Sequence, residues 1–209
     1  ADKIAAHYGV EMKSVLTGFK YIGGEILSLE NVNEEHKFVF GFEESCGYLK
    51  GTYARDKDAV VASMLVCEVA AYLKKQGKTI LDALNEIYAE FGYYLASVKS
   101  VELTGADAMD KAAKMMADLR NAVPAAIGGA TVTVFNDYKT QISRNLLDGT
   151  EATIQLPKSN VLEFVLGEKG SLIVRPSGTE PKVKFYYTAV GENKSASEAL
   201  LAAMKAQLG

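Results

Sequence analysis

Residues 172–185 read LIVRPSGTEPKVKF, and this stretch decides the fold of the second half of the chain. A short apolar run comes first, the six residues PSGTEP follow, and an alternating run comes after them. This is the pattern of two strands joined by a turn. The turn offers the groups that bind a phosphate: a guanidinium, an ammonium, two hydroxyls and a backbone that can approach closely. These groups belong to Arg175, Lys182, Ser177, Thr179 and Gly178. The stretch therefore predicts either a phosphate-binding hairpin or a plain hairpin connection.

Strand signals continue on both sides of this hairpin. The predicted strands are residues 93–103, 130–135, 161–166, 171–174 and 182–190. The predicted helices are residues 106–121 and 196–208. Strands joined by tight turns, with a helix near each end, are typical of an α+β domain on an antiparallel sheet. Residues 136–159 read as a long polar loop, and long ordered loops often serve a function.

The first part of the chain alternates helix and strand signals instead. Residues 58–75 are the clearest helix, because Val61, Leu65 and Tyr72 recur at helical spacing. The other predicted elements are helices at residues 2–8, 19–29 and 79–91 and strands at residues 10–16 and 37–40. Alternating elements of this kind indicate an α/β layer. The two patterns together predict an α/β domain over residues 1–92 and an α+β domain over residues 93–209.

A second chemically suggestive stretch is FGFEESCGY, residues 40–48. At the end of a strand, Glu43 and Ser45 point the same way and Glu44 points the opposite way. A carboxylate beside a hydroxyl suits neighbouring sugar hydroxyls, because a carboxylate accepts two hydrogen bonds. The alternative is an acidic, solvated loop. A glycosidase with paired carboxylates is disfavoured, because adjacent Glu residues lie on opposite faces of a strand.

Two shorter segments each precede a predicted helix. In RDKD, residues 55–58, either aspartate can begin the helix, whereas Arg55 and Lys57 gain nothing from the helix dipole there. These two cations therefore serve a ligand or pair with the neighbouring aspartates. In TGFK, residues 17–20, a glycine turn leads into a helix and places Lys20 in its first turn. That position suits an anionic ligand.

The amino-acid composition limits the classes of protein to which the chain can belong. The chain has 209 residues, of which 48% are hydrophobic and 23% charged, and its net charge is −3. These values exclude a disordered chain and a disulfide scaffold and allow one large domain or two small ones. Two His and two Cys residues cannot make a persuasive zinc site.

The same features bear on location. No apolar run is long enough to span a membrane, no signal peptide is present, and two unpaired cysteines fit a reducing cytosol, so we expect a cytoplasmic protein that does not bind membranes. The chain starts at Ala1 without Met. We therefore expect it to be processed, tagged or cut from something longer.

In this order, the four stretches resemble the C-terminal half of the α-D-phosphohexomutase superfamily, which includes phosphoglucomutases and phosphomannomutases. Residues 138–147 and 156–164 are also similar to bacterial phosphoglucomutases. The resemblance covers nearly the whole chain. It implies an enzyme of four domains, in which the first three are related α/β units and the fourth is like the TATA-binding protein. Residues 1–92 would then be an incomplete third domain, and residues 93–209 the fourth.

The resemblance also implies roles for individual residues. The phosphate that is not being transferred would be held by Arg175, Ser177, Gly178 and Thr179, with Lys182 beside them. The sugar would be bound by Glu43 and Ser45, with Thr17, Gly18, Lys20 and Arg55 nearby. Lys57 would lie near the reacting sugar as an acid/base or electrostatic helper. A Glu-Glu-Ser loop favours a glucose-type enzyme, although mannose- and pentose-type relatives share much of it.

Family members use a phosphoserine of the first domain and Mg²⁺ held by an Asp-rich loop of the second. Their reaction passes through a bisphosphorylated sugar such as glucose 1,6-bisphosphate. Neither the serine loop nor the aspartate loop occurs in this sequence, and no residue is assigned to a metal. We therefore expect a chain that binds hexose phosphates, is inactive alone as an isomerase, and has domains one and two of the same protein as partners.

Two other functions stay open for these residues. One is a stand-alone module that binds sugar phosphates without converting them, since it would have the same Arg175 loop. The other is an interaction domain that uses the antiparallel sheet as a platform for nucleic acid. Residues 93–209 contain 13 Lys and Arg against 12 Asp and Glu. This balance disfavours nucleic acid, whose binding depends on neutralising phosphates.

Overall fold

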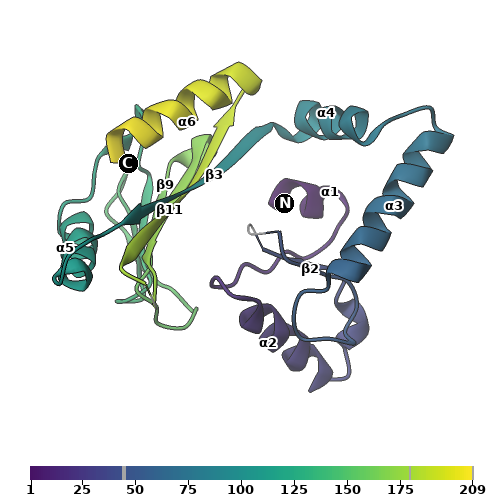
Figure 1. Cartoon of the computed structure of the whole chain (residues 1–209), viewed down its shortest axis with the longest axis horizontal. Coiled ribbons are helices and arrows are strands. Elements are labelled where there is room, and N and C mark those ends of the chain that lie inside the picture. Colours follow the sequence, from purple (N-terminus) through teal and green to yellow (C-terminus); the bar gives the residue numbers. More distant parts are fainter. Residues whose placement is uncertain (44–45, 179, 209) are drawn as a thin grey trace. The chain divides into compact units, whose positions relative to one another are not determined.

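The computed structural model describes residues 1–43, 46–178 and 180–208. The chain forms two compact units, unit 1 (Ala1–Ile87) and unit 2 (Tyr88–Gly209). Figure 1 shows the elements of each. The division falls inside a helix, a few residues before the boundary predicted after residue 92, and that boundary stays a prediction.

Unit 1 is mainly helical in its described part. Its elements are α1 (Asp2–His7), α2 (Phe19–Glu30), the 3₁₀ turn η1 (Glu35–Lys37), β1 (Gly41–Phe42), β2 (Tyr48–Leu49), α3 (Ala59–Lys75) and α4 (Ile80–Phe91). Strands β1 and β2 pair antiparallel, with Gly41 opposite Leu49. The buried apolar cluster of this unit is small and consists of Phe19, Ile26 and Leu49.

The predicted helices of unit 1 are confirmed, and their starts have local causes. Asp58 caps α3, because its carboxylate accepts hydrogen bonds from the backbone N–H groups of Val60 at 2.7 Å and Val61 at 3.3 Å. Before α4, the Thr79 N–H donates to the Asp82 carboxylate, and the Asp82 N–H donates to the Thr79 hydroxyl. These reciprocal bonds form a capping box.

The two strands predicted in unit 1 are wrong. Residues 11–16 adopt no regular secondary structure, and residues 38–40 lie between η1 and β1 without forming a strand. Both segments contain apolar side chains of the kind found in strands, but neither finds a partner strand among the described residues, and an unpaired strand lacks its ladder of hydrogen bonds. Only β1 and β2 pair in the described part of this unit.

Unit 2 is built on an antiparallel sheet of seven strands in the order β3-β11-β10-β9-β6-β7-β8. Its strands are β3 (Tyr93–Glu102), β6 (Val134–Asp137), β7 (Ile142–Asn145), β8 (Glu151–Thr153), β9 (Leu162–Val165), β10 (Gly170–Pro176) and β11 (Lys182–Gly191). The other elements are α5 (Ala108–Asn121), α6 (Lys194–Leu208), the hairpin β4 (Ala126–Ile127) and β5 (Ala130–Thr131), and the 3₁₀ turn η2 (Gly167–Lys169). This architecture confirms the predicted α+β class.

One face of this sheet is covered by helices. Along β11, Val183, Phe185, Tyr187 and Ala189 are buried and alternate with partly exposed residues. The buried residues join one core with Met116 of α5 and Met204 of α6. Side chains of alternate residues leave a strand on opposite faces, so the intervening residues belong to the other face.

The polar loop predicted over residues 136–159 is wrong, because it contains β7 and β8. Residues 142–145 and 151–153 form a hairpin at one edge of the sheet, and Gln141 makes the preceding turn with φ +61°. An edge hairpin exposes both faces, so its residues are polar and lack the apolar alternation of a half-buried strand. The strand predicted at residues 130–135 is also interrupted, since β5 ends at Thr131 and β6 begins at Val134.

Candidate functional site

The predicted phosphate loop lies at the tip of the β10–β11 hairpin. Arg175 pairs with Lys184 in the ladder and Pro176 pairs with Val183. The Ser177 N–H donates to the Lys182 carbonyl at 2.8 Å, which closes the loop. The loop is also fixed to the neighbouring strand, because the Leu103 N–H donates to the Pro181 carbonyl at 2.8 Å. Thr179 lies outside the described residues.

Arg175 and Lys184 place two cations side by side on the face of the sheet that the helices leave uncovered. The two residues are directly opposite in the antiparallel register, and both are half-buried. Directly opposite residues have Cβ atoms about 4.5–5.5 Å apart, and like charges there are destabilising. An anion held between the two side chains would remove that repulsion. This geometry supports a binding site for phosphate.

Lys184 is the residue that the sequence analysis missed. The signal was present, because Lys182 and Lys184 are two apart on a strand and therefore share a face. Lys182 already has a partner: its ammonium lies 2.5 Å from the Glu180 carboxylate. The hydrogen bond from Lys182 holds the pKa of Glu180 below its usual value, and the charge of Lys184 lowers it further.

The polar groups of the loop are partly engaged with its own backbone. The Ser177 hydroxyl oxygen accepts a hydrogen bond from the Glu180 N–H at 3.3 Å. Gly178 is exposed, and a Cβ there would meet no atom within 4 Å. The backbone at Gly178 is thus open to an approaching ligand.

In unit 1, Glu43, Cys46 and Gly47 lie between β1 and β2 in the chain. The Glu43 N–H donates to the Gly47 carbonyl at 2.9 Å, and Cys46 has a φ of +62°. Glu44 and Ser45 lie outside the described residues, so the predicted role of Ser45 stays a prediction. A Cβ at Gly47 would lie 2.9 Å from a Glu43 carboxylate oxygen and 3.0 Å from Cγ of Lys57. Gly47 therefore leaves the space in which the Lys57 side chain passes beside Glu43.

Lys57 joins three of the predicted segments. Its ammonium lies 2.9 Å from Asp56 Oδ1 and 5.6 Å from the centre of the Phe19 ring. The hydrogen bond to Asp56, together with the charges of Asp56 and Glu43, raises the pKa of Lys57. A raised pKa keeps the side chain charged, so the geometry supports the electrostatic role and disfavours a general base.

Gly18 shapes the start of α2. It precedes Phe19 with φ +125°, a conformation that favours glycine, and its carbonyl accepts the N–H of Tyr21 at 3.0 Å. After this turn, the buried Phe19 ring lies beneath the Lys57 ammonium. Thr17 and Lys20 are exposed, and the Lys20 ammonium lies over the Tyr21 ring at 4.9 Å.

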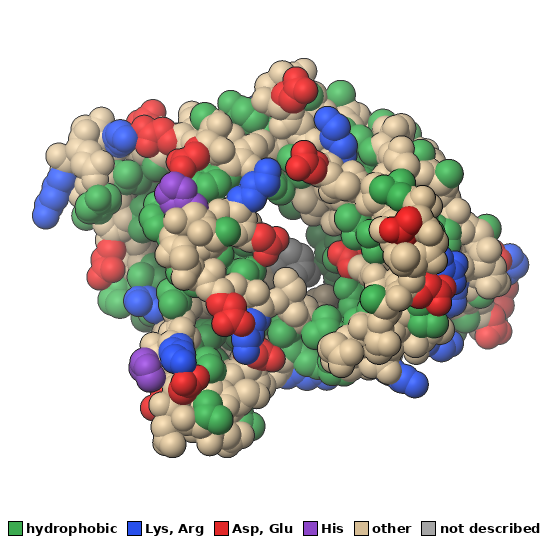
Figure 2. Space-filling model, turned by 180° about the vertical axis from the view of Figure 1, so that it is seen from behind, with side chains coloured by type: hydrophobic (Ala, Val, Ile, Leu, Met, Phe, Trp, Pro, Cys, Tyr) green, Lys and Arg blue, Asp and Glu red, His purple; other side chains and the backbone are tan. Residues whose placement is uncertain are grey.

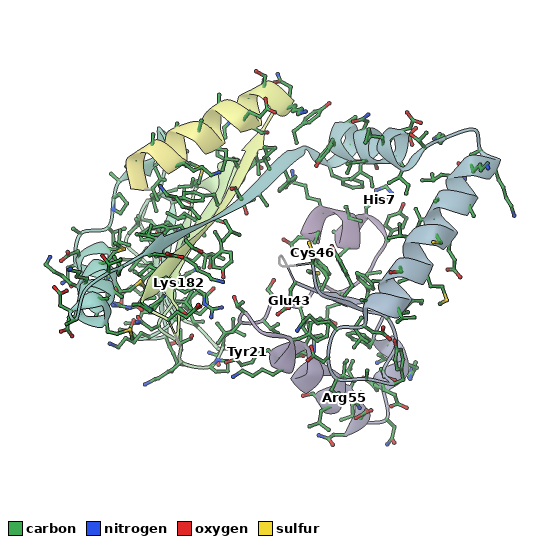
Figure 3. The ribbon with its side chains drawn as sticks, in the orientation of Figure 1. His7, Tyr21, Glu43, Cys46, Arg55 and Lys182 are labelled. Atoms are coloured by element: carbon green, nitrogen blue, oxygen red, sulfur yellow. The ribbon has the colours of Figure 1, made fainter. Side chains whose placement is uncertain are left out.

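Arg55 is not brought to this cluster. Its guanidinium pairs with Glu30 and donates to the carbonyl oxygens of Thr52 and Ala54. Figure 3 shows Arg55 apart from Glu43 within unit 1. The described arrangement thus groups Glu43, Lys57 and Phe19 and directs Arg55 elsewhere.

The family resemblance implies a magnesium ion held outside this chain, by the second domain, and the described residues do not fit such an ion. Within residues 1–43, 46–178 and 180–208, no three His, Cys, Asp or Glu side chains come together in a group that could hold a metal. In the same part of the chain, no helix has the length and apolar character to cross a membrane.

Comparison with known proteins identifies the family to which this chain belongs. A family model described as phosphoglucomutase/phosphomannomutase, alpha/beta/alpha domain III, matches residues 1–91. A second model, the C-terminal domain of the same enzymes, matches residues 102–206. The chain belongs to the phosphoglucomutase/phosphomannomutase family, which confirms the predicted resemblance and the α/β class of its first part.

Individual relatives agree with this assignment. The chain is 38% identical to the phosphoglucomutase of Staphylococcus haemolyticus over 191 residues, covering 91% of this chain and 34% of the relative. It is 40% identical to the phosphoglucomutase of Staphylococcus aureus over 183 residues, covering 88% of this chain and 32% of the relative. The chain thus spans about a third of the length of these relatives.

A solved structure shows the same fold. The open form of pp63/parafusin, a phosphoglucomutase from Paramecium, matches with a TM-score of 0.66 and 19% identity. The match covers 99% of this chain and 34% of that protein.

Proposed function

We propose that this chain supplies the sugar- and phosphate-recognition parts of an enzyme that interconverts hexose 1-phosphates and hexose 6-phosphates, with glucose as the sugar. The observation that carries this proposal is the Arg175–Lys184 pair. These two cations are register partners on neighbouring strands at the base of the Ser177–Lys182 turn. Membership of the family supports the reaction type, and the relatives at 38% and 40% identity are phosphoglucomutases.

Each group has a task in recognition. Arg175 and Lys184 bind the phosphate that is not being transferred, and the backbone at Gly178 and the Ser177 hydroxyl complete its contacts. The Glu43 carboxylate accepts hydrogen bonds from sugar hydroxyls, and the Lys57 ammonium stabilises negative charge at the reacting end of the sugar. The phosphoserine and Mg²⁺ of the family supply the phosphoryl group and charge stabilisation from residues other than those described. The chain alone is therefore expected to bind hexose phosphates and not to convert them.

Calorimetric titration with glucose 6-phosphate tests the phosphate assignment. Removing a charge-assisted hydrogen bond costs about 1.5–3 kcal/mol, so Arg175→Ala is expected to weaken binding by about ten- to a hundred-fold. Lys184→Ala is expected to weaken it as well. Lys169→Ala is the matched control, because Lys169 lies next to the opposite end of β10. Equal affinity in the wild type and Arg175→Ala would overturn the assignment.

A second set of ligands tests the sugar assignment. Glu43→Gln removes the charge but keeps the shape of the side chain, so we expect it to weaken glucose 6-phosphate more than inorganic phosphate. Mannose 6-phosphate and ribose 5-phosphate compare the mannose- and pentose-type specificities directly. Turnover of glucose 1-phosphate by the pure chain would contradict the proposed division of labour.

A further inference from the structure

The Arg55 side chain is bound to neighbouring residues of unit 1. Its guanidinium pairs with Glu30, the last residue of α2, and also donates to the carbonyl oxygens of Thr52 and Ala54. The Arg55 side chain is 42% exposed and that of Glu30 is 33% exposed. The guanidinium thus makes three hydrogen bonds within the protein, all of them to residues other than those grouped around Lys57.

The backbone of Arg55 is packed as closely as its side chain. A Cβ added at Gly23 in the middle of α2 would lie 3.0 Å from the Arg55 carbonyl oxygen and 3.5 Å from Arg55 Cβ. From Gly23 the side chain reaches to Glu30, which is seven residues or about 10 Å further along the helix. Arg55 therefore follows α2 toward its C-terminal end, away from Gly18 and Phe19.

Lys57, two residues later, is held at the other end of the same helix. Its ammonium lies over the ring of Phe19, the first residue of α2. The next residue is also fixed, since the Asp58 N–H donates to the Tyr48 carbonyl at 2.8 Å. Residues 55–58 are thus tied to α2 at Glu30 and to β2 at Tyr48, and Lys57 lies between the two ties.

We propose that Arg55 is a positioning residue that acts through Glu30 to hold Lys57 over Phe19, and that it does not contact the substrate. The proposal rests on the proposed function only in giving Lys57 its role beside the sugar. It reassigns Arg55, which the family resemblance placed near the sugar. It also gives Glu30, a residue outside every motif of the sequence, a part in the site.

The test needs no ligand, because the ring current of Phe19, which lies 5.6 Å from the Lys57 ammonium, is expected to shift the NMR resonances of the Lys57 side-chain methylenes. Phe19→Leu is expected to abolish the shift and so identifies it. Glu30→Gln and Arg55→Ala are each expected to reduce the shift by about half or more. Glu25→Gln is the matched control, because it breaks another exposed ion pair of α2, with Lys13 at 3.1 Å. That control is expected to leave the shift unchanged.

A charge exchange separates positioning from ligand contact. Arg55→Glu alone is expected to lose the ring-current shift, and the double variant Glu30→Arg with Arg55→Glu is expected to recover most of it. An unchanged shift in Glu30→Gln, or no recovery in the exchange, would overturn the proposal. Glu30→Gln is nearly isosteric, so it provides the answer even if Arg55→Ala unfolds unit 1.

Titration then links the geometry to binding. We expect Glu30→Gln to weaken glucose 6-phosphate binding as much as Arg55→Ala, and the charge exchange to restore it. A large loss in Arg55→Ala beside full affinity in Glu30→Gln would mean that Arg55 contacts the ligand and would overturn the proposal. If the wild type binds no hexose phosphate, the proposed function fails while the NMR result still decides the role of Arg55.

Discussion

At the scale of single residues, Tyr187 presents a buried phenol in the core of unit 2. It is 1% exposed, and its hydroxyl has no hydrogen-bond partner among the described residues. Burial without a partner raises the pKa of Tyr187 and costs free energy. Tyr187→Phe is expected to increase the free energy of unfolding of unit 2 by about 1 kcal/mol, as measured by urea denaturation. A loss of stability would show that the hydroxyl has a partner in solution.

Asp137 is a buried charge with good partners. Arg120 donates to its carboxylate at 2.8 and 3.3 Å, and the Lys139 N–H donates at 3.0 Å. Burial alone would raise the pKa of Asp137, but the hydrogen bonds, led by that from Arg120, hold it below its usual value. Arg120 also donates to Asn160. The pair therefore ties α5 to β6 and to the segment before β9.

This pair is expected to make the stability of unit 2 depend on pH. A carboxyl whose pKa is lower when folded stabilises the protein above its ordinary pKa of about 3.9, and the stabilisation is lost as the pH falls through the folded value. The wild type should therefore lose more stability between about pH 5 and pH 3 than Asp137→Asn. Asp137→Asn itself should cost about 3 kcal/mol near neutral pH, because it leaves Arg120 without its charged partner. Parallel denaturation curves for both proteins across this range would contradict the expectation.

At the scale of elements, the β4–β5 hairpin shows how a turn meets a helix. Its two turn residues, Gly128 and Gly129, have φ +59° and +82°. A Cβ at Gly128 would lie 2.7 Å from the backbone nitrogen of Met204 in α6, whereas one at Gly129 would meet nothing within 4 Å. Gln207 adds two hydrogen bonds, from the Gly128 N–H and to the Ala126 carbonyl.

Two substitutions separate backbone strain from this contact. Gly129→Ala is expected to cost about 1–2 kcal/mol, the penalty for a left-handed residue with a Cβ. Gly128→Ala carries the same penalty and also forces the hairpin off α6, so it is expected to cost about 3 kcal/mol or more. Thermal unfolding of both variants gives the comparison. Equal losses would mean that the hairpin moves freely relative to α6.

The elements also show how far sequence reasoning extends. Asp58 and the Thr79–Asp82 box mark helix starts within a few residues, so local chemistry was enough to predict α3 and α4. The strands predicted at residues 10–16 and 37–40 failed, because pairing depends on a partner elsewhere in the chain. In the candidate site, the sequence was enough to predict the turn residues around Arg175, and the strand spacing from Lys182 carried a signal for Lys184. The part played by Glu30 follows only from its ion pair with Arg55, which is distant in sequence.

At the scale of the whole molecule, the two units have very unequal cores. Three buried apolar residues form the cluster of unit 1, against fifteen in unit 2, among the residues that the structure describes. In unit 1, α3 leaves large apolar side chains exposed, including Val60 at 78% and Tyr72 at 66%. Figure 2 shows apolar side chains reaching the surface between charged ones. Unit 1 therefore buries less apolar surface to support its fold.

We expect the chain to unfold in two steps, with unit 1 first. Ile26→Ala, at a fully buried position of unit 1, should lower the free energy of unfolding of the first transition only, by about 2–5 kcal/mol. Phe164→Ala, in the core of unit 2, should lower the free energy of unfolding of the second transition only, by about 3–5 kcal/mol. Scanning calorimetry of the wild type and both variants resolves the transitions. A single transition affected equally by both substitutions would show that the units unfold together.

The ladder beneath the Ser177–Lys182 turn has a consequence for the proposed binding of an anion. Strand β11 is paired along its whole length, with seven residues of β10 on one side and ten of β3 on the other. Arg175 and Lys184 therefore stand on stiff backbone, and little backbone conformational entropy is lost when an anion arrives. A preformed site of this kind is entered at a rate set mainly by diffusion and charge. A mutation that weakens the site but keeps its charges should therefore shorten the residence time of the anion and leave its rate of arrival little changed.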